Sequence, residues 1–323
     1  MHGSALLVGL SDTSTPLIQS CLAELHLAAV SLDDAGPGAL PAPGDHALVL
    51  CELPASTVSA EELRTVVRPQ GVLTPVLLVA GRNGAPAPSV VARWGAEECV
   101  PHPLDRGHLT RAIARALLKR EVLKYRSNGG ANSSSGDVLL YASKALTRCL
   151  EAKDESSVDH ARTVAQIAGS LAQYYGLDEW TVEAAQLAGA LHDLGKVSVS
   201  GEILRKPGWL SSSEWQEVRR HPEVGAEILG SVDAFAEVAV YVLHHHERHD
   251  GEGYPAGLRN GQIPLVSRII AAADAYDAMV RPRPYREREG AQYAAHQLRA
   301  HAGTQWDPEV VNGMFECVPQ LQG

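Results

Sequence analysis

The sequence predicts two domains of different class, an N-terminal doubly wound α/β domain and a C-terminal all-helical domain. In the first 120 residues, short apolar runs alternate with helical patterns, whereas the residues after 137 show helical patterns almost throughout. A Gly- and Ser-rich stretch lies between the two regions. The chain has 323 residues, which also favours two domains over one.

Three continuous apolar runs in the N-terminal region predict strands that are buried on both faces of a parallel sheet. They cover residues 5–9, 47–50 and 76–80, and residues 15–26 and 59–67 between them have helical spacing. Pro and Gly mark the joins between these elements. Strands that alternate with helices in this way predict a doubly wound α/β domain.

This half of the chain resembles a bacterial two-component receiver domain through its order of elements and the segments HALVLCELP, TPVLLVA and GAEECVPHPLD. The resemblance implies a phosphoacceptor Asp at the end of the third strand, an acidic pair after the first, and a Lys before a Pro near the fifth. Here the third strand ends in Glu52, the acidic pair is reduced to Asp12, and His102 replaces the Lys. We therefore expect a degenerate receiver without a phosphoacceptor that serves docking or dimerisation. An α/β domain of another kind is the alternative.

The predicted domain boundary follows a long amphipathic helix at residues 104–125. The segment SNGGANSSSGD at residues 127–137 buries little apolar surface and is typical of a flexible connector. We expect a receiver-like domain at 1–120, a helix end and linker at 121–137, and a helical domain at 138–323. Within the last, helices are predicted at residues 138–149, 157–175, 181–191, 212–229, 234–246, 264–279 and 287–302. We also expect homodimerisation through the 104–125 helix.

Composition argues against several classes of function. The net charge of −10 is unsuited to binding a nucleic-acid polymer, and no apolar run approaches the length of a membrane helix. The five cysteines lie far apart without a CxxC pair, which argues against a disulfide framework or a zinc-thiolate site. We expect a cytoplasmic protein that supplies positive charge locally to an anionic ligand.

Metal-binding residue types are concentrated in the helical region, where the run HHHERHDGEGYPAGL covers residues 244–258. Asp193 follows His192 directly, and one Asp can bridge two cations. Asp274 lies in an apolar helix, where burial of an unpaired carboxylate is costly. We interpret His244 and His249 as a flanking residue and a solvated loop residue. The remaining set predicts a metal site: His160, His192, Asp193, His221, His245, His246 and Asp274.

The segment from about residue 150 to 315 resembles an HD-GYP domain. It contains, in order, the motifs HARTVAQIA, LHDLGKVSVS, ILRKPGWLSSSEWQEVRRHPEVGAEIL, HHERHDGEGYPAGLRNGQIPLVSRI, AADAYDAM and RPRPYR. The resemblance implies a helical HD-superfamily phosphodiesterase that hydrolyses cyclic di-GMP at a two- or three-metal site, with Fe or Mn as the metals.

The same resemblance divides the ligands into two sets that share Asp193. The first metal would be held by His160, His192, Asp193 and Asp274. The second would be held by His221, His245, His246 and Asp193. Family members with a third metal have a Glu four residues before the first His, and here that position is Ser156. We therefore expect two divalent ions and, as product, the linear pGpG rather than GMP.

The resemblance also suggests residues that bind the substrate. Lys196 matches the lysine of the family's HDxGK motif, and Arg283 and Arg286 occupy the positions of basic residues near the second phosphate. Surface arginines without a role are the alternative for the last two.

The loop formed by Gly253, Tyr254 and Pro255 is expected to contact the substrate or partner proteins such as GGDEF domains. A structural lid on the helices is the alternative for this loop.

The sequence thus predicts a metal-dependent phosphodiesterase that converts cyclic di-GMP to pGpG, with His192, Asp193 and Lys196 as catalytic residues. Two alternatives remain open. One is a catalytically weak cyclic di-GMP sensor or adaptor that acts through protein partners. The other is an HD phosphohydrolase that acts on another cyclic dinucleotide.

Overall fold

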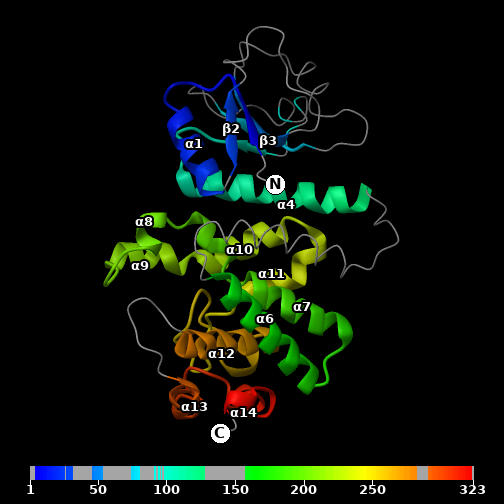
Figure 1. Ribbon diagram of the computed structural model, residues 1–323, viewed down its shortest axis with the longest axis vertical. Coiled ribbons are helices and arrows are strands. Elements are labelled where there is room, and N and C mark those ends of the chain that lie inside the picture. The colour runs from blue at the N-terminus through cyan, green and yellow to red at the C-terminus, as the bar shows by residue number, and fades with distance from the viewer. Residues whose placement is uncertain are drawn as a thin grey trace. The chain divides into compact units, whose positions relative to one another are not determined.

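The chain forms two compact units, Met1–Lys153 and Asp154–Gly323, which are drawn in Figure 1. The computed structural model describes residues 4–25, 27–31, 46–53, 74–80, 91, 94, 96, 98–127, 157–281 and 290–321. The helices predicted at residues 59–67 and 138–149 and nearly all of the predicted connector lie outside these described residues.

A five-stranded parallel sheet forms the N-terminal unit. Its strands are β1 (Ser4–Val8), β2 (Ala28–Ser31), β3 (His46–Glu52), β4 (Val76–Val79) and β5 (Glu98–Val100), in the spatial order β2-β1-β3-β4-β5. The helices α1 (Thr15–Glu24) and α4 (Arg106–Ser127) belong to the same unit. The sequence patterns missed β2, which is largely exposed, and β5, which has only 3 residues.

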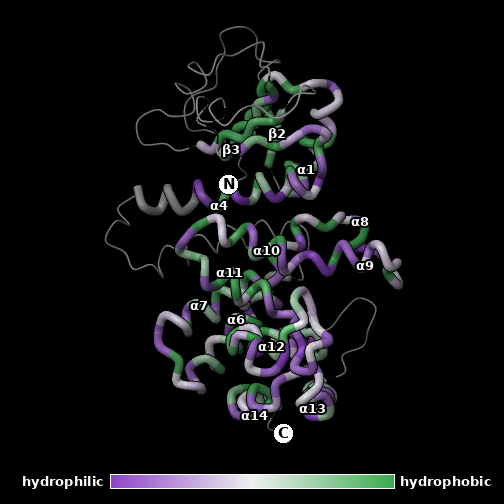
Figure 2. The backbone as a smooth tube through the Cα atoms, turned by 180° about the vertical axis from the view of Figure 1, so that it is seen from behind, coloured by the Kyte–Doolittle hydropathy of each residue, from purple (hydrophilic) through white to green (hydrophobic). Residues whose placement is uncertain are grey.

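The two faces of this sheet contribute to separate apolar clusters, because successive side chains of a strand point to opposite faces. Leu7 and Leu50 pack with α1 and α4 on one face. Leu6 and Leu78 are buried on the other face. Burial on both faces accounts for the continuous apolar runs in the sequence, which colour β3 as hydrophobic in Figure 2.

The C-terminal unit is helical throughout its described part. Its α-helices are α6 (Ser157–Tyr174), α7 (Glu179–Leu191), α8 (Gly201–Leu204), α9 (Ser212–Arg219), α10 (His221–Gly230), α11 (Ala236–Leu243), α12 (Leu265–Val280), α13 (Gly290–Ala300) and α14 (Pro308–Cys317). Helix α6 packs against α7 and α12, and α10 packs against α11 and the short 3-10 helix η3 (Leu194–Ser198). None of the described helices combines the length and the apolar character needed to cross a bilayer.

The single helix predicted at residues 212–229 is wrong, because the chain forms two helices there. Helix α9 ends at Arg219 and α10 begins at His221, with Pro222 in its first turn. Pro has no amide hydrogen for a continuous helix, and its ring clashes with the preceding turn. The break puts His221 at the beginning of α10.

The helix predicted at residues 234–246 is also too long. Helix α11 begins at Ala236 and ends at Leu243. The apolar spacing ends there, and the amide of Glu247 instead donates to the carbonyl of His244, 3.1 Å away, in a turn. His245 and His246 are therefore carried by the turn that follows α11.

Candidate metal centre

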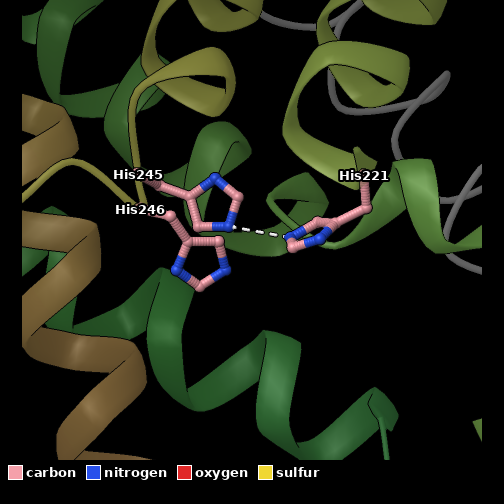
Figure 3. A group of neighbouring side chains, drawn as sticks. All are labelled: His221, His245 and His246. Atoms are coloured by element: carbon pink, nitrogen blue, oxygen red, sulfur yellow. Dashed lines mark hydrogen bonds between the residues drawn. The ribbon is translucent and has the colours of Figure 1, made fainter. Parts of the chain in front are cut away.

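Two groups of side chains that could hold a metal ion lie in the helical unit, and within each group the candidate ligand atoms are within 4.8 Å of one another. The first group consists of His160 from α6, His192 directly after α7, and Asp274 from α12. The second group consists of His221 from α10 and of His245 and His246 from the turn after α11, and Figure 3 shows their rings converging. The fold therefore brings His160 and Asp274, which are 114 positions apart in the chain, into one group.

Asp193 lies between the two groups. Its Oδ2 atom is 3.6 Å from Nε2 of His192, and its Oδ1 atom is 3.5 Å from Nε2 of His221. Lys196 is also at this carboxylate, with Nζ 2.6 Å from Oδ2. One carboxylate thus has one oxygen directed toward each group, which is the arrangement required of a bridging ligand.

Backbone carbonyls fix the orientation of three of the imidazole rings. In each case Nδ1 faces the carbonyl oxygen three residues earlier: His192 to Gly189 at 2.8 Å, His221 to Val218 at 2.8 Å, and His245 to Val242 at 2.6 Å. A ring that donates from Nδ1 to a carbonyl keeps a lone pair on Nε2, and this tautomer is the one that binds a metal through Nε2.

The Nε2 atoms of His221 and His245 lie 3.2 Å apart (Figure 3). Because both rings direct Nδ1 at a carbonyl, the neutral tautomers place two Nε2 lone pairs face to face. Two facing lone pairs repel one another unless a cation lies within reach of both. The donor set of the second group therefore fits a metal ion, and neutral imidazole with carboxylate oxygen suits borderline divalent metals.

In the first group, the ring of His160 lies between two carboxylates, those of Asp274 and Asp277. Nε2 of His160 is 3.3 Å from Oδ1 of Asp274, and Nδ1 of the same ring is 2.7 Å from Oδ2 of Asp277. Asp277 in turn accepts hydrogen bonds from Arg281 at 2.8 and 3.1 Å. Sequence reasoning missed Asp277, although its position three residues after Asp274 puts both carboxylates on one side of α12.

The pKa values of the histidines differ between the two groups. Burial lowers the pKa of His221 to about 4 and that of His246 to about 3, so both are neutral at pH 7. Burial also opposes the charged form of His160, but hydrogen bonds to Asp274 and Asp277 outweigh it and raise the pKa to about 9. The second group can accept a cation without losing a proton, whereas His160 must release one.

Comparison with known proteins agrees with this geometry, because residues 144–310 match the HD domain. The chain therefore belongs to the HD-domain family.

Three proteins of named activity are similar in sequence to this chain. The "Cyclic di-GMP phosphodiesterase response regulator RpfG" of Xanthomonas campestris is 38% identical over 55% of this chain and 47% of its own length. A "Cyclic di-GMP phosphodiesterase" of Thermotoga maritima is 30% identical over 70% of this chain and 67% of its own length. The "3'3'-cGAMP-specific phosphodiesterase 2" of Vibrio cholerae is 36% identical over 53% of this chain and 33% of its own length. The chain thus spans about half the length of the first of these relatives.

The loop at Tyr254 is hydrogen-bonded to the turn that carries His245 and His246. The Tyr254 amide donates to the carbonyl of His246 at 3.1 Å, and the two rings are stacked with centroids 4.9 Å apart. The buried carboxylate of Glu247 accepts from the amides of Ala256 at 2.7 Å and Leu258 at 3.1 Å. Sequence reasoning missed Glu247, which directly follows the histidine run.

Gly253 allows this loop to lie against the turn. A Cβ atom at Gly253 would collide with the backbone of Glu247 and Arg248. The glycine is therefore required by close backbone approach.

The remaining predicted residues are placed as follows. Pro255 is exposed in the loop, and His244 and His249 lie outside both groups. Nδ1 of His244 is 3.5 Å from Oε1 of Glu247. Arg283, Arg286 and Ser156 lie outside the described residues.

Proposed function

We propose that the chain is a metal-dependent phosphodiesterase that hydrolyses cyclic di-GMP to pGpG. The observation that carries this proposal is the position of Asp193, with one carboxylate oxygen directed at each of two histidine groups. The printed names of the relatives from Xanthomonas and Thermotoga support cyclic di-GMP as the substrate. The Ser at position 156 favours two ions and a linear product.

Seven side chains would hold the two ions. One ion would be bound by His160, His192 and Asp274, the other by His221, His245 and His246, and Asp193 would bind both. When bound, such ions lower the pKa of a water molecule to give a nucleophile and stabilise negative charge on phosphoryl oxygens.

Neighbouring side chains keep the carboxylate of Asp193 ionised, so that it can bind cations. Burial opposes ionisation of Asp193, but Lys196, His192 and His221 outweigh it and hold its pKa well below the usual range. The carboxylate is therefore ionised at neutral pH. Lys196 also puts an ammonium group beside the centre, where it can meet a phosphate. We retain Lys196, Tyr254, Arg283 and Arg286 as proposed substrate-binding residues.

Hydrolysis of a different cyclic dinucleotide is the second candidate. It is favoured by the similarity to the Vibrio enzyme named for 3'3'-cGAMP. Both candidates use the same two-ion centre, so they differ only in how the bases are recognised.

A substrate panel tests the proposal. The purified protein, loaded with Mn or Fe under reducing conditions, is incubated with cyclic di-GMP, 3'3'-cGAMP and cyclic di-AMP, and the products are separated chromatographically. We expect preferential conversion of cyclic di-GMP to pGpG. His192→Ala and Asp193→Ala should abolish it, and Asp159→Ala, which changes an exposed carboxylate, should not. Binding of cyclic di-GMP without conversion would overturn the proposal in favour of a sensor.

We further propose that the N-terminal unit is a degenerate receiver. Its strand order β2-β1-β3-β4-β5 is the flavodoxin-like order of doubly wound sheets. Glu52 ends β3, and its carboxylate accepts from the amide of Ser11 at 2.8 Å and from the Ser11 hydroxyl at 3.1 Å. The carboxylate at this strand end is thus engaged within the fold, and no Asp is present there to form an acyl phosphate.

Incubation with a small phosphodonor such as acetyl phosphate tests this second proposal. We expect the intact mass of the full chain to stay unchanged. A stable phosphorylated species on the N-terminal unit would overturn it.

A further inference from the structure

We propose that Arg219 is an additional substrate-binding residue of the HD-domain centre. The inference rests on the proposed function, because it takes the ligand to be a cyclic dinucleotide. Arg219 lies in a segment that carries the family resemblance, but it is not among the site residues predicted from the sequence; it is the last residue of α9.

His246 is stacked with Tyr254, and Tyr254 is in cation–π contact with Arg219; we refer to these three side chains as the stack. The rings of His246 and Tyr254 are 4.9 Å apart with an interplanar angle of 28°. On Tyr254, the Cζ atom of Arg219 lies 4.4 Å from the ring centroid. A guanidinium at this distance from an aromatic ring is attracted by the negative face of the ring. The stack thus fixes the position of a positive charge relative to the ligand His246.

The stack is connected to the centre at both ends. Tyr254 is joined to His246 through its amide, which donates to the His246 carbonyl at 3.1 Å. Arg219 precedes His221, another ligand-type residue of the same group, by only two positions. The guanidinium is therefore held by the same two segments that carry the second histidine group.

The hydrogen-bond donors of Arg219 are available. The residue is exposed, and within the described part of the chain its guanidinium has no hydrogen-bond or ion-pair partner. The cation–π contact leaves N–H groups of the guanidinium available to donate to other acceptors. A guanidinium that presents two N–H groups matches a pair of acceptor atoms.

A cyclic dinucleotide containing guanine offers such acceptor pairs in two places. The two non-bridging oxygens of a phosphodiester form one pair, and O6 and N7 of guanine form the other. The shared chemistry is a planar pair of acceptors that a guanidinium can contact at two points. Lys cannot reproduce this geometry, although it keeps the charge.

A positioning role is the competing explanation, in which Arg219 only presses Tyr254 against His246. Loss of Arg219 would then disturb the metal ligand and lower metal occupancy or kcat. Loss of a substrate contact would instead raise Kd and KM, with the metals still bound. Metal content and nucleotide affinity therefore separate the two roles.

The test uses the full chain loaded with Mn, in the wild type and in Arg219→Ala and Arg219→Lys. Arg220→Ala is the matched control, because it removes the same charge from the neighbouring exposed position. We expect Arg219→Ala to weaken cyclic di-GMP binding about tenfold or more, with Arg219→Lys in between. Metal content should stay near the wild-type value, and KM should rise together with Kd. Unchanged affinity, an effect no larger than that of Arg220→Ala, or loss of bound metal would overturn the proposal.

Comparison of two nucleotides identifies which acceptor pair Arg219 contacts. Cyclic di-AMP has the same phosphodiesters but no guanine edge, so an equal loss of affinity for both nucleotides assigns the phosphate. A loss confined to cyclic di-GMP assigns guanine. Because Kd is measured without turnover, a wild type that binds but does not hydrolyse would refute the proposed function and still test Arg219.

Discussion

The Nδ1 atom of His160 lies 2.7 Å from the Oδ2 atom of Asp277. This contact gives His160 the carboxylate partner that metal-binding histidines commonly have, which fixes the ring and raises its basicity. Asp277 is itself buried and held by Arg281, so the orientation of His160 depends on a chain of contacts along α12.

Asp277→Asn should weaken metal binding at the first group. The amide keeps the shape of the side chain but removes the charge that orients His160, and loss of such a partner typically costs 10- to 100-fold in affinity, so we expect about tenfold or more. Metal titration with elemental analysis measures it. Asp159→Asn, which changes an exposed carboxylate next to His160, is the control. Equal affinities in the two variants would contradict this role for Asp277.

The metal-free protein should be most stable near neutral pH. The pKa of His221 is lowered by burial to about 4 and that of His246 to about 3, against about 6.5 in the unfolded chain. Below pH 6.5 the unfolded state therefore binds protons that the folded state does not. Stability present above pH 6.5 is lost as the pH falls toward 4, by about 1.4 kcal/mol per pH unit for each group.

His160 has the opposite effect on the pH dependence of stability. Its pKa is raised to about 9, so its contribution is complete below pH 6.5 and is lost as the pH rises through 9. Denaturant unfolding in EDTA between pH 5 and 9 measures the loss of stability toward acid pH, called the acid limb, and the loss toward alkaline pH. His246→Gln should flatten the acid limb, and His301→Gln, at an exposed position, should not. A wild-type profile without an acid limb would show that these histidines are not buried in their neutral form.

Glu247→Ala should destabilise the helical unit by about 2 kcal/mol, because it leaves the amides of Ala256 and Leu258 without their acceptors. Chemical denaturation measures the change in the free energy of unfolding. Glu252→Ala in the same loop is the control, since Glu252 is exposed. Similar effects of the two substitutions would mean that Glu247 does not anchor the loop.

Gly195→Ala should disrupt the centre. A Cβ atom at Gly195 would collide with the carbonyl oxygen of His221 and would lie 2.7 Å from the amide nitrogen of Gly225, so α10 would have to move away from Asp193. We expect loss of bound metal together with reduced stability. Gly230→Ala is the control in α10, because its Cβ would meet only Ala239 at an ordinary 3.9 Å. Full metal occupancy in Gly195→Ala would contradict this requirement for close approach.

Much of the fold could be predicted from sequence, because burial imposes a pattern on it. The β3 and β4 segments are apolar runs, and α6, α7 and α12 have clear helical spacing. Strand β5 has only 3 residues, and β2 is apolar in sequence but largely exposed. The break between α9 and α10 depends on Pro222, whose effect outweighs the apolar spacing on both sides of it.

The residues of the candidate site, too, could be predicted only in part from the sequence. Residues that carry metal-binding chemistry stand out by type and by clustering, as at His245 and His246. Their supporting residues do not, because Asp277 and Glu247 act through contacts that only the folded chain creates. Arg219 resembles any surface arginine until its position over Tyr254 is known.

Anomalous diffraction from crystals of the Mn-loaded protein tests most directly whether Asp193 bridges two metal ions. We predict two anomalous peaks about 3.5–4 Å apart, one beside each histidine group, with the Asp193 carboxylate in contact with both. A single peak, or two peaks of which only one contacts Asp193, would contradict the account.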